Sequence, residues 1–179
     1  MAHLTASVEY GIHCLLWLAG AGGRPLSSRD LADLQKISPS FVAKIFPKLE
    51  KAGIVEASEG VRGGYRLARR PKDISVLHIV DAIEGDKPLF DCQEIRRRCA
   101  TFGEQPPTWA TDGVCAIHAV MQSAEKAMRD ALAAHTLADL AATFADKAPA
   151  AFVAGVQDWM TDRASARKPG RHTRTKPAP

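Results

Sequence analysis

The sequence has few aromatic residues and no apolar run long enough to span a membrane. Aromatic residues make up 6% of the 179 positions, and only two of them are tyrosines. The apolar run CLLWLAGAGG, which begins at Cys14, is shorter than the ~20 residues that a bilayer-spanning helix needs. It follows Glu9 and lacks a preceding basic segment, so it is also a poor signal peptide. We therefore expect a cytoplasmic protein without membrane contact.

Cysteine is scarce as well, with four residues in the chain. In a reducing compartment such cysteines rarely form structural disulfides and are better suited to metal binding or redox chemistry. Cys14, beside Leu15 in an apolar stretch, is instead typical of a small buried residue. The sequence shows no set of nucleophile, base and orienting residue, so an enzyme is not expected.

Hydrophobic residues nevertheless make up 46% of the chain and alanine is abundant, which favours a helical protein with a buried core. The net charge of +4 is unevenly placed, because six Lys and Arg residues and no acid lie from Arg163 onward, leaving residues 1–162 at −2. Segment 163–179 is Pro-rich and lacks apolar residues, which predicts a disordered basic tail. A solvated tail and a non-specific phosphate-binding arm both fit this composition.

The first third of the chain predicts a helix-turn-helix. Apolar residues at helical spacing indicate a helix over 4–20, after which GAGGRP breaks the chain. Ser27 or Ser28 caps a short second helix, SSRDLADLQ. Ser38 is a good N-cap for a third helix, and Pro39 suits its first position. Two short helices joined by a tight turn, the second opening with Ser-Pro-Ser, are typical of this DNA-binding motif.

The third helix contains Pro47, which costs about 3 kcal/mol in a regular helix, so we expect a kink there or a tilted last turn before Gly53 ends the helix. A β-hairpin follows, with IVEAS and YRLAR as strands and EGVRGG as a turn. Such a hairpin after a recognition helix is a wing, with Arg62 at its tip. ISVLHIVDAIEG then forms a helix with Ser75 as cap and Gly85 as stop.

Residues 86–114 lack periodicity and contain Cys92 and Cys99, and a long loop of this kind is usually functional. A long Ala-rich helix follows from Ala116 to about Ala134. It would leave an apolar stripe in water unless it packed on a second copy of the chain, so a homodimer is expected. The apolar residues of this helix are Ile117, Val120, Met121, Ala124, Met128 and Leu132. Thr136 opens a further helix, TLADLAATFA, with a capping box.

These stretches together resemble the winged-helix transcription regulator family that includes IscR, NsrR and RirA. The shared signature reads LTASVEYGIHCLLWLA, ISPSFVAKIFPKLEKAGIV, GVRGGYRLAR and ISVLHIVDAIEG, then a cysteine-bearing loop and a long helix ending in TLADL. The resemblance implies a mainly α fold with a small β-hairpin wing, in a homodimer that binds double-stranded operator DNA. It divides the chain into a winged helix-turn-helix domain (1–85), a cluster-binding loop (86–114), a dimerisation helix with C-terminal helices (115–162) and the basic tail (163–179).

Within this family, VEYGIHC, SPSFVAK and DCQEIRRRC resemble the redox-sensing RsrR-like branch. Members of that branch hold a [2Fe–2S] cluster between two cysteines of one subunit and a Glu and a His from the first helix of the other. The resemblance therefore implies Glu9, His13, Cys92 and Cys115 as the cluster ligands. It also implies that the regulator responds to redox state.

The chemistry of these residues is compatible with that assignment. Glu9 and His13 are four residues apart on a helix, where Cβ atoms lie ~5–6 Å apart, so both can reach one iron. Replacing cysteine ligands by nitrogen donors raises the potential of a cluster, as in Rieske centres. A site with two thiolates, one imidazole and one carboxylate should therefore be easier to reduce than a plant-type cluster.

A rival ligand set stays open. In the common type of the family the cysteines lie closer together, whereas here six residues separate Cys92 from Cys99 and fifteen separate Cys99 from Cys115. Cys99 is either a spare thiol or a ligand of a three-cysteine site. His118 lies three residues after Cys115, at an offset where IscR-like proteins use a histidine ligand. The rival set is therefore Cys92, Cys99, Cys115 and His118.

The DNA contacts are expected mainly at the start of the recognition helix. Residues there enter the major groove nearest to the bases and phosphates. Arg62 in the wing can reach a minor groove. The recognition-helix candidates are Ser38, Ser40, Phe41 and Lys44.

Two other functions remain as alternatives. The first keeps the DNA-binding fold but replaces the cluster by direct oxidation of Cys92, Cys99 or Cys115. The second, from a different class, is an iron–sulfur electron-transfer protein. A helix-turn-helix and a wing have no use in an electron carrier, so the regulator is preferred.

Overall fold

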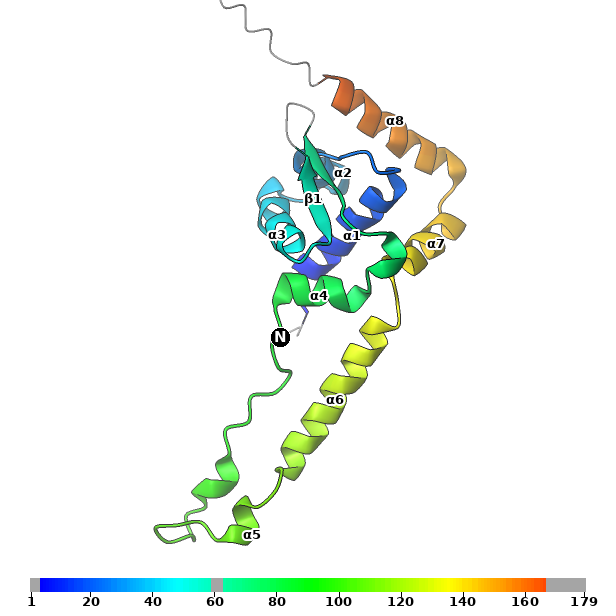
Figure 1. Ribbon diagram of the computed structural model, residues 1–179. Helices are drawn as coiled ribbons and strands as arrows, with labels where there is room; N and C mark the ends of the chain where they lie inside the picture. The colour runs from blue at the N-terminus through cyan, green and yellow to red at the C-terminus, as the bar shows by residue number, and fades with distance from the viewer. Residues whose placement is uncertain (1–3, 59–62, 167–179) are drawn as a thin grey trace, which may run out of the picture.

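In the computed structural model, which describes residues 4–58 and 63–166, a long arm projects from a helical body (Figure 1). The body holds both ends of the described chain, and the arm consists of residues 86–115 and one long helix. The elements are α1 (Ala6–Gly20), α2 (Ser28–Gln35), α3 (Pro39–Lys51), β1 (Val55–Ser58), β2 (Gly64–Leu67), η1 (Pro71–Asp73), α4 (Val76–Glu84), η2 (Ile95–Arg98), α5 (Thr108–Thr111), α6 (Ala116–Ala133), α7 (Leu137–Lys147) and α8 (Ala150–Ala166). The mainly α fold with a two-stranded wing is thus confirmed.

Hydroxyl side chains cap five of the helices. Each accepts a hydrogen bond from a backbone N–H of the first turn, which satisfies a group that has no partner inside the helix. The capping residues are Thr5 for α1, Ser27 for α2, Ser38 for α3, Ser75 for α4 and Thr136 for α7. The predicted caps are confirmed, with Ser27 rather than Ser28 at the start of α2. Gly85 ends α4 as predicted.

The core lies where α1, α3 and α4 meet. Helix α3 turns one face inward and buries four apolar residues, Val42, Ile45, Phe46 and Leu49. On α1, a Cβ atom at Gly11 would lie 2.5 Å from Cδ1 of Ile83 in α4 and 3.5 Å from Cγ2 of Ile45. The absence of a side chain at Gly11 lets the three helices approach closely, so α1 cannot shift without disturbing both α3 and α4.

The wing is tied to the chain segment before α2. Strands β1 and β2 pair antiparallel, ending with Ser58 opposite Gly64. Tyr65 exchanges two backbone hydrogen bonds with Leu26, with N···O distances of 2.9 and 2.8 Å. A Cβ atom at Gly64 would lie 2.3 Å from the Leu26 carbonyl oxygen. Only glycine therefore fits between the hairpin and this segment.

We expect Gly64→Ala to lower the free energy of unfolding by about 1–3 kcal/mol, because the added methyl group must push two hydrogen-bonded backbone segments apart. Urea unfolding followed by circular dichroism measures this change. Gly103→Ala is the matched control, since a Cβ atom there meets nothing within 4 Å. Equal stability of the two variants would contradict the expectation.

The two C-terminal helices cover α1 and α2. Trp17 of α1 packs edge-on against Phe144 of α7, with ring centroids 5.5 Å apart. Near the end of α8, Nε of Arg163 donates to Oδ1 of Asp30 in α2 at 2.9 Å, and the Asp30 carboxylate is buried. Residues 163–166 are therefore helical, whereas the sequence placed the start of the disordered tail there. Residues 167–179 lie outside the described chain.

Two further sequence predictions need correction or refinement. Segment 86–114, which was expected to lack secondary structure, contains the short helices η2 and α5. Helix α3 is assigned from Pro39 to Lys51 with Pro47 inside it, and the expected kink or tilt at Pro47 stays a prediction. Pro47 is exposed, so the backbone bond that it removes faces water. Among the described residues no helix has the length and apolar character needed to cross a membrane.

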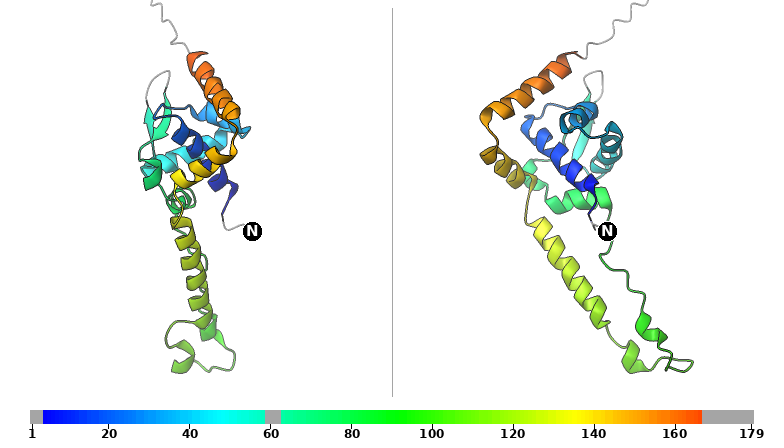
Figure 2. Two further views of the ribbon diagram at one scale, coloured as in Figure 1. Left: turned by 90° about the vertical axis from the view of Figure 1, so that its right-hand side faces the viewer. Right: turned by 180° about the vertical axis from the view of Figure 1, so that it is seen from behind.

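Helix α6 runs beside segment 86–115 in all views and carries two different faces (Figures 1 and 2). One face is half-buried towards the body and that segment, with Met121, Met128 and Leu132. The other face is open to solvent: Ile117 is 62% and Val120 67% exposed. This outer stripe consists of Ile117, Val120, Ala124, Ala127 and Ala131, all exposed. The single apolar stripe expected from the sequence therefore divides into an inner and an outer set.

Candidate DNA-binding surface and metal centre

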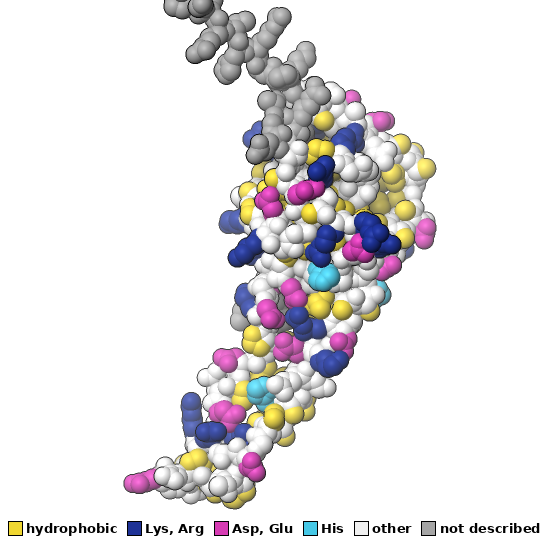
Figure 3. Space-filling model, in the orientation of Figure 1, with side chains coloured by type: hydrophobic (Ala, Val, Ile, Leu, Met, Phe, Trp, Pro, Cys, Tyr) yellow, Lys and Arg dark blue, Asp and Glu magenta, His cyan; other side chains and the backbone are white. Residues whose placement is uncertain are grey.

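The start of α3 presents the predicted DNA contacts to solvent. Ser38, Ser40, Phe41 and Lys44 are all exposed. Oγ of Ser38 accepts from the Ser40 backbone N–H at 3.3 Å and lies 2.8 Å from Oγ of Ser40. The Ser38 hydroxyl is therefore engaged both as the cap and with the Ser40 hydroxyl, whereas no hydrogen bond or ion pair engages Lys44 among the described residues. Lys44 is thus the most available of these side chains for DNA. Figure 3 shows Lys and Arg side chains along the edge of the body where α3 lies. Arg62, the fifth predicted contact, lies outside the described residues.

Phe41 also has an internal contact that the sequence did not predict. Its ring packs edge-on against the ring of Tyr10 in α1, with centroids 5.4 Å apart and an interplanar angle of 80°. Tyr10 directly follows Glu9. The reading end of α3 thus touches the helix that carries the predicted Glu and His ligands. Nothing in either local sequence indicates this contact, because it depends on the crossing of two helices.

Glu9 and His13 lie one turn apart on α1, and both are exposed. Gly11, halfway between them in sequence, faces the opposite way into the core. Among the described residues, no hydrogen bond or ion pair engages either side chain. His13 lies at the edge of an apolar cavity of about 290 Å³ between α1 and the C-terminal helices. Both side chains are therefore accessible to a group outside this chain.

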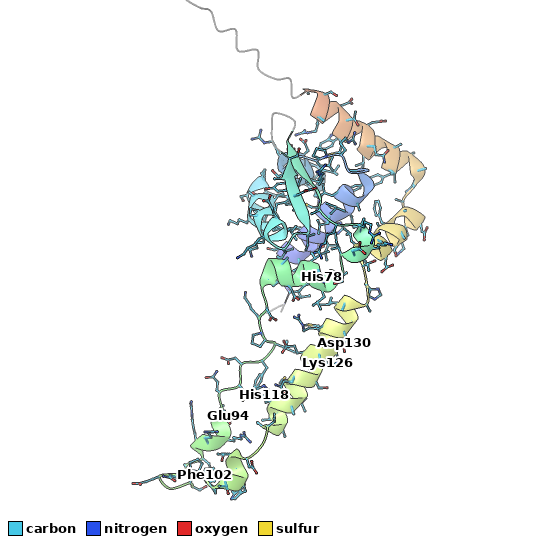
Figure 4. All side chains as sticks on the ribbon, in the orientation of Figure 1. His78, Glu94, Phe102, His118, Lys126 and Asp130 are labelled. Atoms are coloured by element: carbon cyan, nitrogen blue, oxygen red, sulfur yellow. The ribbon has the colours of Figure 1, made fainter. Side chains whose placement is uncertain are left out.

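Cys92 and Cys115 both lie in the arm and are half-buried. Cys92 lies in the segment between α4 and η2, and Cys115 lies at the start of α6. Sγ of Cys92 is 3.9 Å from Oε1 of Glu94. Cys115 is the N-cap residue of α6, but its side chain makes no capping hydrogen bond. The Arg96 side chain donates to two carbonyl oxygens just before Cys115 and forms an ion pair with Glu94 at 2.9 Å. Figure 4 labels Glu94 in this arm.

The other members of the rival ligand set are engaged differently. Cys99 is exposed, and its Sγ lies 3.0 Å from Oγ1 of Thr101. Hydrogen bonds from Thr101 lower the pKa of the Cys99 thiol. The ring of His118 packs edge-on against that of Phe90, with centroids 6.1 Å apart. Cys99 is thus an accessible thiol, and His118 helps to hold the two segments of the arm together.

Cys14 is buried, as the sequence predicted, with 1% of its surface exposed. Nε2 of Gln35 donates a hydrogen bond to its Sγ at 3.1 Å. Burial raises the pKa of the Cys14 thiol to about 11. This thiol therefore stays protonated near neutral pH and belongs to the core.

The described part of one chain does not bring three potential His, Cys, Asp or Glu ligands together. The predicted donors instead form two separate pairs, with Glu9 and His13 on the body and Cys92 and Cys115 in the arm. Thiolate, imidazole and carboxylate are all known ligand types for iron. By donor chemistry the four residues fit an iron–sulfur cluster, provided that a second chain brings the pairs together.

A solvent-facing recognition helix, a wing and a cysteine-bearing arm define a winged-helix DNA-binding regulator. Residues 4–143 match the model of the Rrf2 family, which is described as iron-dependent transcriptional regulators. The chain belongs to this family of transcriptional regulators, and it is not an enzyme.

The chain is similar to several relatives and solved structures. The Rrf2 protein of Nitratidesulfovibrio vulgaris is 36% identical over 138 residues, which are 76% of this chain and 85% of that protein. The solved structure of T. potens IscR has a TM-score of 0.60 and 26% identity, covering 84% of this chain and 96% of that one. CymR of B. subtilis, described as a global cysteine regulator, has a TM-score of 0.62 and 24% identity, covering 80% and 98%. The likeness to CymR supports the fold alone.

Proposed function

We propose that this regulator is a homodimer that binds operator DNA and senses redox state through a [2Fe–2S] cluster at the subunit interface. Cys92 and Cys115 of one copy and Glu9 and His13 of the other would hold the cluster. The observation that carries the proposal is the separation of these donors into two regions, with Glu9 and His13 exposed on the body and Cys92 and Cys115 half-buried in the arm. When bound, such a cluster supplies one-electron redox chemistry.

The outer stripe of α6 supports the dimer. Its residues alternate at spacings of three and four, the pattern with which two helices pack along a common seam. Three of the five are alanines, which permit close approach of the helices. Ile117 and Val120 would be covered by the second copy, whereas in a single chain both are more than half exposed.

Contacts of α1 and α6 with the DNA-binding domain could transmit a change at the proposed ligands to the recognition helix. Tyr10 touches Phe41 at the reading end of α3, and Gly11 packs against α3 and α4. Arg129 of α6 forms a two-pronged ion pair with Asp81 of α4, at 3.0 and 2.9 Å. A change in how Glu9 and His13 are held would therefore move α1 against the recognition helix.

A dimer reads two half-sites only when its recognition helices are correctly spaced. Redox state can shift DNA affinity only through contacts that differ between the two states, and a nearly complete switch needs about 5.5 kcal/mol. Ser40 and Lys44 would contact bases or phosphates. Ser38, as the N-cap, and Phe41, through its contact with Tyr10, would fix the position of α3 on the DNA. Arg62 in the wing would enter the minor groove.

The proposal is tested by anaerobic purification, followed by ultraviolet–visible spectra and by iron and acid-labile sulfide content per chain. We expect wild type and Cys99→Ala to show the same [2Fe–2S] spectrum, because Cys99 is not among the proposed ligands. His13→Ala should lose or shift the spectrum, because the imidazole would be a ligand. Retardation of promoter fragments by the oxidised and reduced protein then measures whether DNA affinity depends on cluster state.

The outcomes separate the ligand sets. Loss of the cluster in Cys99→Ala, with no change in His13→Ala, would replace the proposed set by Cys92, Cys99, Cys115 and His118. Iron-free wild type that still binds DNA would eliminate both sets.

A regulator with a direct thiol switch is the second candidate. It is favoured by the exposed Cys99 thiol, whose pKa is lowered by Thr101. Colourless, iron-free protein whose DNA binding changes with thiol oxidants, and not in Cys99→Ala, would support it. The electron-carrier alternative has lost its basis, because the chain belongs to a family of transcriptional regulators.

A further inference from the structure

Arg96 ties the chain just after Cys92 to the chain just before Cys115. Its Nη1 donates to the Asp112 carbonyl oxygen at 3.2 Å, and its Nη2 donates to the Gly113 carbonyl oxygen at 2.8 Å. Arg96 lies four residues after Cys92, and the two carbonyls lie just before Cys115. One guanidinium therefore bridges the chain after the first cysteine to the chain before the second.

The backbone has a positive φ angle on each side of this bridge. Glu94 has a φ of +48° and Gly113 a φ of +63°, a region that residues with a side chain rarely adopt. Glu94 is held there by ion pairs with Arg96 at 2.9 Å and Arg97 at 3.6 Å. Its other carboxylate oxygen, Oε1, is the atom near Cys92. Glu94 and Arg96 thus form one unit beside the Cys92 thiol.

The three consecutive arginines of η2 have different environments. The Arg96 side chain is 23% exposed, whereas that of Arg97 is 58% exposed. Arg98 is also exposed and makes no hydrogen bond or ion pair among the described residues. The pKa of Arg96 is raised, first by its hydrogen bond to Glu94 and further by the nearby charges of Glu94, Cys115 and Cys92. Through Glu94, which lies beside Cys92, and through the carbonyls just before Cys115, Arg96 is the arginine that contacts the surroundings of both cysteines.

We propose that Arg96 is a positioning residue: it holds Cys92 and Cys115 together as the two-thiolate half of the site, and its charge favours the reduced state. The proposal rests on the function proposed above. Two neighbouring thiolates repel each other, and a fixed guanidinium offsets that repulsion. Reduction adds one negative charge to the site, so a nearby positive charge raises the reduction potential.

The first test measures how close the Cys92 and Cys115 thiols lie in iron-free protein. It uses a Cys99→Ala background, so that the one remaining cysteine besides these two is the buried Cys14. A short bifunctional maleimide should link Cys92 to Cys115 within one chain, as read by peptide mass spectrometry. We expect Arg96→Met and Arg96→Lys to lower the yield of this link at least fivefold, because neither can bridge both carbonyls. Arg98→Met, which removes an equal charge two residues away, should leave the yield unchanged.

The second test measures the reduction potential of the cluster-loaded protein by titration with dithionite in the presence of mediators. In Arg96→Met the ratio of reduced to oxidised cluster at a fixed potential should fall about tenfold, which for one electron is a shift of 59 mV to more negative potential. Arg96→Lys keeps the charge and should recover most of the shift. Arg98→Met should stay near the wild-type potential.

The proposal would be overturned if Arg96→Met gave the same result as Arg98→Met in either measurement. Far-ultraviolet circular dichroism of each variant checks that the fold is retained. Iron-free wild type would be a failure of the proposed function instead. In that case the linking experiment still decides whether Arg96 holds the two thiols together.

Discussion

Val120→Glu is expected to convert the proposed dimer into monomers and to abolish tight binding to operator DNA. Val120 lies near the start of the outer stripe of α6 and is 67% exposed in a single chain. In the proposed dimer it would face its copy across the seam, where two added carboxylates would lie close together without compensating charges. Like charges buried in this way are strongly unfavourable.

The loss of DNA binding should be large, because a monomer reads one half-site. Linking two binding units raises the overall affinity by about 10²–10⁴ over that of one unit, and dissociation of the dimer removes this gain. Sedimentation velocity measures the dissociation, and fluorescence anisotropy with an operator duplex measures the affinity.

Gln122→Glu is the matched control, since it adds the same charge to α6 at an exposed position away from the stripe. It should remain dimeric and should bind DNA nearly as wild type does. A dimeric Val120→Glu protein would show that the subunits associate through another surface.

The elements that the sequence predicted well are those decided by local chemistry. Ser38, Ser75 and Thr136 cap helices because a hydroxyl next to an unpaired N–H acts over two or three residues. Gly85 ends α4 for the same kind of local reason, because its backbone adopts a φ of +83°. The helix-turn-helix and the wing are built from such signals, so the fold class and the family could be predicted.

The sequence could not show contacts that depend on how elements are placed in space. Three consecutive arginines look alike in RRR, yet only Arg96 reaches the carbonyls before Cys115. The edge-on contact of Tyr10 with Phe41 joins two helices that are separated by α2. The division of α6 into two faces likewise depends on where the body lies. The proposed cluster ligands remain a prediction, because the donors lie in two separate pairs on one chain.

A mixed dimer is expected to regain one cluster when one subunit lacks the Glu and His ligands and the other subunit lacks the cysteine ligands. One subunit would carry Glu9→Ala and His13→Ala, and the other Cys92→Ser and Cys115→Ser. Each variant alone should form cluster-free dimers, because both of its sites lack two ligands. In the mixed dimer, one site combines the intact cysteines of the first subunit with the intact Glu and His of the second.

The experiment uses two different affinity tags, co-expression and purification over both columns under anaerobic conditions. Iron and sulfide content should reach about half of the wild-type value, which corresponds to one [2Fe–2S] cluster per dimer. The reciprocal arrangement is the control: all four substitutions are placed in one subunit, and its partner is wild type. Neither of its sites then has four ligands, so this dimer should contain no cluster.

The two mixed dimers carry the same four substitutions and differ only in their distribution, so general effects on folding or on cluster delivery act on both. If each chain supplied all of its own ligands, the results would be reversed. The wild-type partner in the control would then keep its cluster, and the complementary dimer would have none. The comparison thus decides whether Glu9 and His13 serve the cysteines of the partner subunit, the arrangement through which a cluster in the arm could act on α1 and the recognition helix.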